Sequence, residues 1–382
     1  MDEIRLSAST AGDGLSPSAS AAISSVHKKL SKRRRRPLIV LLVVALVAGG
    51  GATWTWVLVP MLAPTYKTTF LIDAAEGDLA SVTTALSTVV GNSGSRDSQS
   101  LRSFGGECGA DDNTTQLVGF GTGNRQEITE AARSVRQGAK ATLQRGIVEA
   151  VDDFTSGFSL KAKQVNRIIV VTRHGKDACD TDDEFVQKQI RDRATAAGLT
   201  IEFRFIGYQV PDGEPLRTLT TQLQTQEPMF ANSPEELRRA LNWFTTIEPM
   251  LRSAQSVVTV LNPTVDKLNA ATDALKSGRF DLADSALAEA RDAVVDVEIK
   301  DLDGRTASAD AITLRDRAVR LRTLQEEVIG AADVLAGEAR SGRNLTDPLA
   351  VYTKAAEAYN DEAGQMTREL TRLRGLALGG TR

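Results

Sequence analysis

The pattern of apolar and polar positions divides the chain into a region where strands and helices alternate and a later region of helices alone. From Thr68 to about Val210, short apolar runs alternate with amphipathic stretches, which is typical of an open sheet with helices on both faces. The run Phe70–Ile72 ends abruptly at Asp73 and small residues, as expected of a central strand whose carboxyl end borders a ligand site. The pattern therefore predicts an α/β fold with a doubly wound, mostly parallel sheet.

The other elements of this region follow from local signals. Arg167–Thr172 is a continuous apolar run of the kind that parallel sheets bury on both faces. Ser233 followed by Pro234 is a strong start for a helix that runs through Phe244. Further strands are expected at Leu101–Phe104, Gln116–Phe120 and Leu199–Tyr208. Further helices are expected at Leu79–Val90, from Asn124 to Gly138, at Leu143–Phe154, and from Thr181 to Gly198.

Beyond Ile247 the strand signal disappears, and alanine and leucine dominate to the end of the chain. Apolar residues there recur every three or four positions, which places them on one helical face. We expect Pro249 and Pro263 to interrupt the first helical stretch. Residues 248–376 are predicted to form three or four long antiparallel helices, a bundle or coiled coil through which the chain could form a homo-oligomer.

The amino-terminal part predicts a membrane tether. Residues 1–36 carry eight lysines and arginines against three acidic residues and are expected to be a disordered, basic, cytoplasmic tail. No charged residue follows until Lys67, and residues 37–60 are long and apolar enough to be a transmembrane signal anchor. A cleaved secretory signal and a twin-arginine signal at Arg35–Leu38 are alternatives. The anchor predicts a single-pass cell-membrane protein whose bulk is extracytoplasmic.

Charge and cysteine content agree with this location. The chain has a net charge of −3 although its tail is basic, so the remainder is acidic, which argues against nucleic-acid binding. The two cysteines, Cys108 and Cys179, are expected to form one disulfide outside the cytoplasm. Two cysteines without a histidine cluster argue against a structural zinc site.

Residues 66–247 resemble the von Willebrand factor A domain. The segments that carry the resemblance are FLIDAAEGD from Phe70, GAKATLQRGIVEAVDDF from Gly138, IVVTRHGKDAC from Ile169 and NSPEELRRALNWF from Asn232. The cysteines after SFGGE and TRHGKDA are similar to a pair in bacterial extracellular members. The resemblance implies a von Willebrand factor A-like domain at 66–247, followed by the helical domain at 248–376.

Many members of that family hold a divalent cation with an Asp-x-Ser-x-Ser loop, a threonine and a later aspartate. Asp73 and Thr142 match the first aspartate and the threonine, but Ala75 and Gly77 stand at the serine positions. Arg173 stands where the later aspartate is expected. Because Mg²⁺ needs oxygen ligands, the resemblance implies a degenerate site without metal, and we expect no cofactor.

The surviving residues suggest a different use of the same face. One hypothesis is that the Arg173 guanidinium replaces the metal and pairs with Asp73. The alternative is that Arg173 points to solvent while Asp73 accepts backbone N–H groups. His174 and Asn113 are placed on the same face, with His174 expected to be an ordinary loop histidine.

The sequence therefore predicts a non-catalytic protein-binding module for adhesion or recognition, with an unidentified protein as partner. No nucleophile elbow or zinc-protease motif supports an enzyme. One alternative is a structural or assembly subunit of a cell-envelope membrane complex, with the helical domain as the main contact. The other is a metal-dependent adhesion protein of the von Willebrand factor A type.

Overall fold

The structure is a computed structural model that describes residues 66–379, apart from residues 76, 111, 156–163, 180, 181, 197, 306 and 307. The predicted tail at 1–36 and anchor at 37–60 lie outside the described residues. Among the helices of the described ranges, none is both long and apolar enough to cross a membrane. By their internal contacts, residues 63–382 form one compact unit.

Six strands form one sheet in the order β3-β2-β1-β4-β5-β6. The strands are β1 (Tyr66–Asp73), β2 (Ser98–Phe104), β3 (Thr114–Gly121), β4 (Val165–Thr172), β5 (Ile201–Tyr208) and β6 (Met229–Ala231). Every neighbouring pair is parallel except β2 with β3. The predicted α/β, doubly wound, mostly parallel sheet is confirmed, and β1 lies inside it between β2 and β4. The short edge strand β6 was not predicted, because three residues give no periodic signal.

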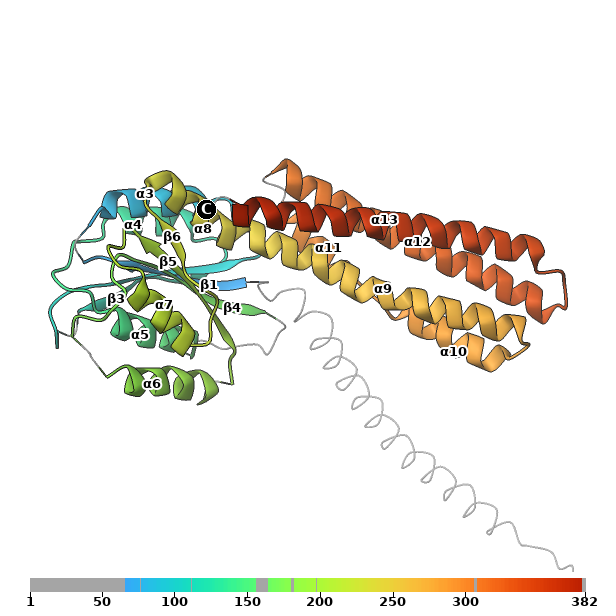
Figure 1. Ribbon diagram of the computed structural model, residues 1–382, viewed down its shortest axis with the longest axis horizontal. Helices are drawn as coiled ribbons and strands as arrows, with labels where there is room; N and C mark the ends of the chain where they lie inside the picture. The colour runs from blue at the N-terminus through green and yellow to red at the C-terminus, as the bar shows by residue number, and fades with distance from the viewer. Residues whose placement is uncertain are drawn as a thin grey trace, which may run out of the picture. The chain divides into compact units, whose positions relative to one another are not determined.

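Helices cover both faces of the sheet (Figure 1). They are α3 (Leu79–Val90), α4 (Arg125–Arg133), α5 (Leu143–Thr155), α6 (Asp183–Ala196), α7 (Glu214–Gln222) and α8 (Pro234–Asn242). Side chains alternate along a strand, so Phe70 and Ile72 pack with α3, α4 and α8, whereas Leu71 packs with α5, α6 and α7. The sequence missed α7, and α4 ends at Arg133 instead of Gly138.

A helical region follows the sheet. After a π-helical turn, η2 (Trp243–Ile247), its helices are α9 (Glu248–Lys276), α10 (Phe280–Arg291), α11 (Asp296–Asp303), α12 (Ala309–Arg340) and α13 (Thr346–Gly379). The expectation that prolines interrupt the first helix is wrong, because α9 is continuous through Pro249 and Pro263. Pro249 lies in the first turn, where no N–H partner is needed. Pro263 removes one interior hydrogen bond, and α9 continues because Leu261 and Leu268 are buried on either side of it.

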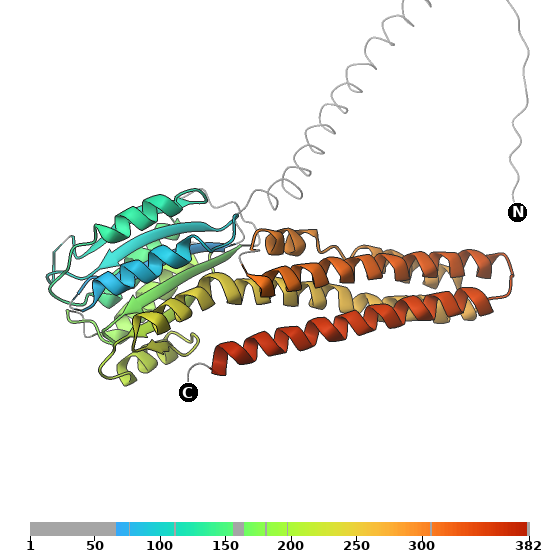
Figure 2. The same cartoon turned by 90° about the horizontal axis from the view of Figure 1, so that it is seen from above.

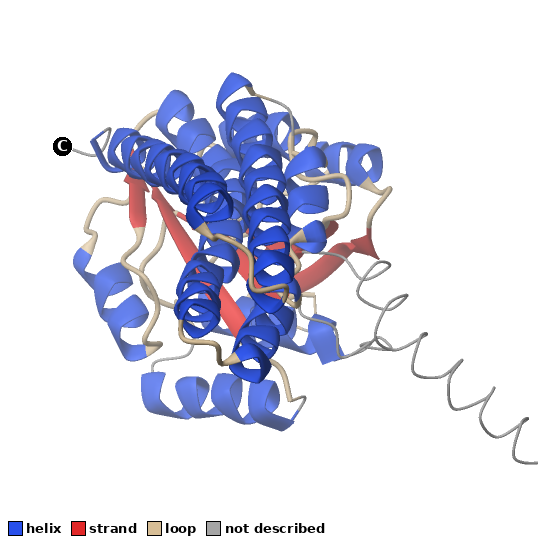
Figure 3. Cartoon of the chain, turned by 90° about the vertical axis from the view of Figure 1, so that its right-hand side faces the viewer, coloured by secondary structure: helices blue, strands red, loops and turns tan. Residues whose placement is uncertain are grey.

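The three long helices pack against one another, and α10 runs beside α9 (Figures 1 and 2). In the view along them, they stand in front of the strands of the sheet (Figure 3). Their core consists mainly of leucine and alanine, such as Leu321, Leu324 and Ala332 on α12. Small alanines allow close helix packing, as expected for a bundle. The separate domains 66–247 and 248–376 and the homo-oligomer stay predictions.

A buried cluster of charged residues joins the helices to the strand starts. Arg305, fully buried after α11, donates to both oxygens of Asp97, which precedes β2, at 2.9 and 2.7 Å. It also donates to both oxygens of Asp301 at 2.8 and 3.0 Å, and its guanidinium lies 5.0 Å from the Tyr66 ring centroid. A Cβ atom at Gly94 would lie 2.8 Å from this guanidinium, so glycine leaves the space that the arginine needs.

A second set of ion pairs continues this cluster between β5 and α9. Arg204 donates to Glu248 at 2.6 Å and to Glu202 at 2.9 Å, and Arg252 donates to Glu202 at 2.7 Å. Arg167 of β4 donates to the carbonyl oxygen of Phe244 at 2.5 Å. We call these two sets together the joint. Because these guanidinium groups are paired with carboxylates or carbonyls, Arg305 and Arg167 can be fully buried in the joint without the cost of lone charges.

Candidate functional site

The side chain of Asp73 lies at the carboxyl end of β1 and is only 5 % exposed. Its Oδ1 accepts the backbone N–H of Ala75 at 2.9 Å. Its Oδ2 accepts the hydroxyl of Thr172 at 2.8 Å and the backbone N–H of Arg173 at 3.3 Å, and lies 3.0 Å from Nδ1 of His174. Because β1 and β4 are parallel neighbours, the residues after both strands meet at one edge. Groups of the chain itself thus satisfy this buried carboxylate.

The hypothesis of a guanidinium on Asp73 is wrong. The ring of His174 lies beside this carboxylate, with Nδ1 3.0 Å from Oδ2, and Arg173 reaches the carboxylate through its backbone N–H. The Arg173 side chain extends instead over Gly77, where a Cβ atom would lie 3.1 Å from Arg173 Cδ and 3.3 Å from Nη1. Gly77 has a φ of +143°, which L side chains rarely adopt. Because Gly77 has no side chain, the Arg173 side chain has room to lie over it.

A hollow opens beside these residues at the carboxyl edge of the sheet. It encloses about 290 Å³, open solvent at its mouth included. Its lining consists of Asp73, Ala75, Gly77, Asp78, Leu79, Val82, Val171, Thr172, Arg173, Tyr208 and Gln209. Four of the seven residues predicted for the binding face are therefore brought together here. The prediction of a site at the end of β1 agrees with this position.

The other seven lining residues were not predicted, and three of them, Asp78, Tyr208 and Gln209, form a polar group. Asp78 caps α3 by accepting the backbone N–H of Ser81 at 3.1 Å, and it accepts the hydroxyl of Tyr208 at 3.1 Å. Gln209 donates to the same Tyr208 oxygen at 3.3 Å. Hydrogen bonds from Ser81, and then from Tyr208, hold the pKa of Asp78 below its ordinary value. Burial raises the pKa of Tyr208. The predicted strand ending at Tyr208 could have revealed this residue, since parallel strands end at the same edge.

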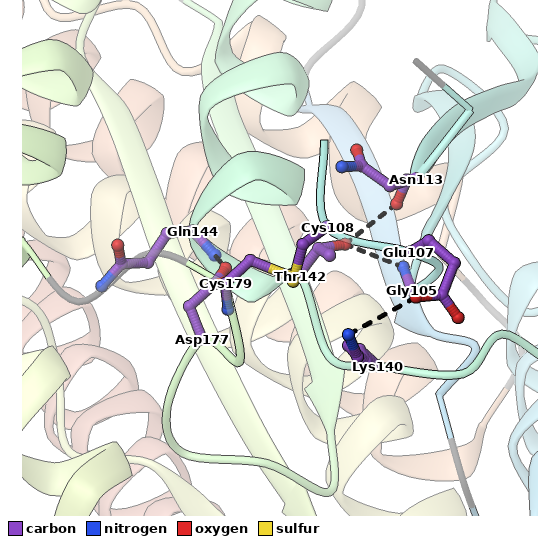
Figure 4. The surroundings of a disulfide bond; sticks show 9 residues. All are labelled: Gly105, Glu107, Cys108, Asn113, Lys140, Thr142, Gln144, Asp177 and Cys179. Atoms are coloured by element: carbon purple, nitrogen blue, oxygen red, sulfur yellow. Dashed lines mark hydrogen bonds and ion pairs between the residues drawn. A yellow bond between two sulfur atoms is a disulfide. The ribbon is translucent and has the colours of Figure 1, made fainter. Parts of the chain in front are cut away.

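Thr142 and Asn113 contact each other, and neither of them lines the hollow. The Thr142 hydroxyl donates to the backbone oxygen of Asn113 at 2.9 Å and accepts the N–H of Gly105 at 3.0 Å (Figure 4). The amide oxygen of Asn113 is buried without a hydrogen-bond partner among the described residues. These two residues therefore tie the loop before α5 to the loop between β2 and β3.

The predicted disulfide between Cys108 and Cys179 is present beside Thr142 (Figure 4). It joins the loop after β2 to the loop after β4. Buried Asp177 supports the second loop by accepting the N–H groups of Gln144 at 2.7 Å and Cys179 at 2.8 Å. These bonds fix the backbone on this side of the site, a role for Asp177 that the sequence did not predict.

The donor groups do not fit a divalent cation held in the family pattern. Ala75 and Gly77 offer no side-chain oxygen, and both oxygens of Asp73 already accept hydrogen bonds. The Thr142 hydroxyl is also engaged on both sides. Arg173, which stands where the family has its later aspartate ligand, lines the same hollow and offers no oxygen. Too few oxygen ligands remain for an octahedral ion.

No protein-family model and no curated protein matches this chain. Among solved structures, the chain is similar to the pilus adhesin SpaC from Lactobacillus rhamnosus GG, with 13% identity and a TM-score of 0.39. This match covers 48% of the chain and spans 30% of the length of the adhesin.

Two further solved structures are similar over 48% of the chain. The vWF domain of the type V pili tip protein Mfa5 from Porphyromonas gingivalis has 11% identity, a TM-score of 0.36 and 94% of its length matched. The von Willebrand factor type A protein from Catenulispora acidiphila has 15% identity, a TM-score of 0.34 and 42% of its length matched. The doubly wound sheet described above is the fold class that the von Willebrand factor A resemblance implies.

Proposed function

We propose that the protein is a membrane-tethered, non-catalytic module that binds another protein at the carboxyl edge of its sheet, without a metal ion. The observation that carries the proposal is the state of Asp73. This carboxylate accepts hydrogen bonds from Ala75, Thr172 and Arg173 and contacts His174, so it is already satisfied where a metal site would need it free. The hollow beside it stays available to a side chain of a partner.

The non-catalytic part of the proposal is supported by the bonds that the two cysteines and the Thr172 hydroxyl already make within the chain. Cys108 and Cys179 are bonded to each other, so neither provides a thiolate nucleophile. The Thr172 hydroxyl is buried and contacts Asp73 and the backbone oxygen of His174. A nucleophile with a free base beside it is what covalent catalysis requires.

The location is proposed from the sequence, with residues 37–60 as the span and the bulk of the chain outside the cytoplasm. The chain enters the sheet at Tyr66, and Asp73 lies at the other end of the same eight-residue strand. At about 3.3 Å per residue, the seven steps from Tyr66 to Asp73 separate the two by roughly 23 Å. The recognition edge is therefore at the opposite end of the strand from the point of entry.

A second candidate function is a structural or assembly subunit that uses the helical region as its main contact. The observation in its favour is a set of exposed valines. Val294 is 62 % exposed before α11, and Val334 on α12 and Val351 on α13 are 59 % and 61 % exposed. Covering such apolar side chains with a partner removes them from water and lowers the free energy of the system.

Photo-crosslinking in membranes separates the two candidates. The full chain would carry a photoreactive amino acid either at exposed Lys176, in the loop after β4, or at exposed Val351 on α13. We expect a protein adduct from position 176 that disappears when Arg173→Glu is added, with no adduct from position 351. An adduct from position 351 alone would favour the assembly subunit and contradict the proposal.

A further inference from the structure

The hollow at the carboxyl edge contains one cation whose side chain has no partner within the described residues. Arg173 is half-buried, and the hydrogen bond that it makes among the described residues comes from its backbone N–H and not from its guanidinium. The charged groups of Asp73 and Asp78 in the same lining already accept hydrogen bonds from the chain. The joint at the other end of the sheet shows the contrast, since Arg305 there binds two carboxylates.

We propose that the Arg173 guanidinium receives the carboxylate of a glutamate or aspartate side chain from the protein partner. This inference rests on the proposed function, because it names the chemistry of the partner at that same edge. The five N–H groups of a guanidinium form a planar fork that matches the two oxygens of a carboxylate. Such charge-assisted pairs are stronger in a half-buried site than in open water.

The lining favours a carboxylate over a phosphate group. Asp73 and Asp78 place two negative charges in the same lining, and a doubly charged phosphate would meet twice the repulsion that a carboxylate meets. Phosphate sites also use free backbone N–H groups. Here the N–H groups of Ala75 and Arg173 are given to Asp73.

The apolar part of the lining suits the stem of an acidic side chain. Val82 and Val171 are 6 % and 2 % exposed, and Leu79 lies beside them at the start of α3. The methylene groups of a glutamate would contact these side chains while its carboxylate reaches Arg173. This arrangement provides a place for each part of the ligand.

Protection from an arginine-selective dicarbonyl reagent tests the carboxylate site on the full-length protein. The probe is capped glutamate, N-acetyl-glutamate N-methylamide, with the matching capped glutamine and inorganic phosphate as comparisons. The matched control residue is Arg368, which is exposed on α13 and has no ion pair among the described residues. Peptide mass spectrometry reports the modification rate of each arginine separately.

We expect excess capped glutamate to slow the modification of Arg173 and to leave Arg368 unchanged, with no effect of capped glutamine. Equal rates at Arg173 with and without capped glutamate would overturn the inference. Stronger protection by phosphate than by capped glutamate would also overturn it and assign the hollow to phosphate.

Variants at Arg173 separate this inference from the proposed function. In the crosslinking assay at position 176, Arg173→Gln should reduce the adduct about tenfold or more, as expected for the loss of a charge-assisted pair. Arg173→Lys keeps the charge without the fork and should give an intermediate yield. An adduct that is unchanged in Arg173→Gln but lost in Tyr208→Ala would retain the binding edge and refute the role of Arg173. If both variants kept the full adduct, the proposed binding edge and the role of Arg173 would both be refuted.

Discussion

The two ends of the central sheet use charged side chains in opposite ways. At the strand starts, the joint buries arginines such as Arg305 in contact with carboxylates of the same chain. At the carboxyl edge, Asp73 is satisfied mainly by backbone and uncharged groups, and Arg173 is left beside a hollow. A buried charge is tolerated only where it has partners. The comparison therefore indicates that charge at one end fixes the fold, whereas the Arg173 charge at the other end lies beside the hollow where we propose recognition.

The pKa values follow the same division. Burial acts to lower the pKa of Arg305, but the carboxylates of Asp97 and Asp301 outweigh it, so the pKa lies above the ordinary value. Burial raises the pKa of Tyr66, which lies among these arginines, to about 12. Arg305 and Tyr66 thus keep their charge state throughout the physiological range of pH.

The largest effect is expected from breaking the joint. Arg305→Met would leave Asp97 and Asp301 buried at 2 % and 3 % exposure without their cation. Removing one partner of a buried ion pair costs about 3–5 kcal/mol of unfolding free energy. Urea denaturation of the purified full-length protein would measure the loss.

Arg343→Met is the matched control for this variant. Arg343 pairs with Glu338 at 2.9 Å, but its side chain is 69 % exposed, and exposed pairs contribute about 1 kcal/mol or less. If both variants lost the same small amount, the joint would not be the fixed end of the sheet.

The next effect is expected from reducing the disulfide. The bond between Cys108 and Cys179 spans 71 residues, and the chain-entropy model assigns a closed loop of that size about 4 kcal/mol. Since the bond lies at the carboxyl edge, reduction should loosen that edge before the joint. Hydrogen exchange with and without reductant would measure both ends in one experiment.

Faster exchange is expected around Gly105 and Cys179, while the N–H of Ser95, which donates to Gly304 at the joint, stays protected. A Cys108→Ser, Cys179→Ser variant should behave as the reduced protein does. Unchanged exchange after complete reduction would mean that the loops are held by their hydrogen bonds alone.

The sequence predicted the elements that have long periodic or apolar signals. Arg167–Thr172 is a strand because its apolar run can be buried on both faces, and it lies inside β4. The position of the site followed from Asp73, since a polar residue after a buried strand marks the carboxyl edge. The disulfide followed from the presence of two cysteines and the expected export.

The remaining features depend on tertiary contacts that the sequence does not encode locally. Pro263 signals a helix break, but burial of its neighbours against other helices keeps α9 continuous. The direction of the Arg173 side chain could not be derived from the sequence. The residue does reach Asp73 as its position suggests, but through its backbone N–H, which every residue type has, and not through its guanidinium. Tyr208 was missed because its partner Asp78 lies 130 residues away.

The smallest effect is expected at the rim of the hollow, from Tyr208→Phe. The lost hydrogen bond from Tyr208 to Asp78 should cost about 1 kcal/mol at neutral pH. The pKa of Asp78 is lower in the folded protein than its ordinary value of 3.8, so its ionised form stabilises the fold. That contribution is complete above the ordinary pKa and is lost as the pH falls through the folded value. The difference in unfolding free energy between wild type and variant should therefore be full at neutral pH and shrink under acid conditions.

Urea denaturation across this range of pH measures this difference, with Tyr352→Phe as the control because the hydroxyl of Tyr352 contacts the neutral Asn269. A difference that did not change with pH at position 208 would mean that the tyrosine acts through packing and not through the Asp78 carboxylate, and the rim would then resemble the bundle core more than a polar recognition edge.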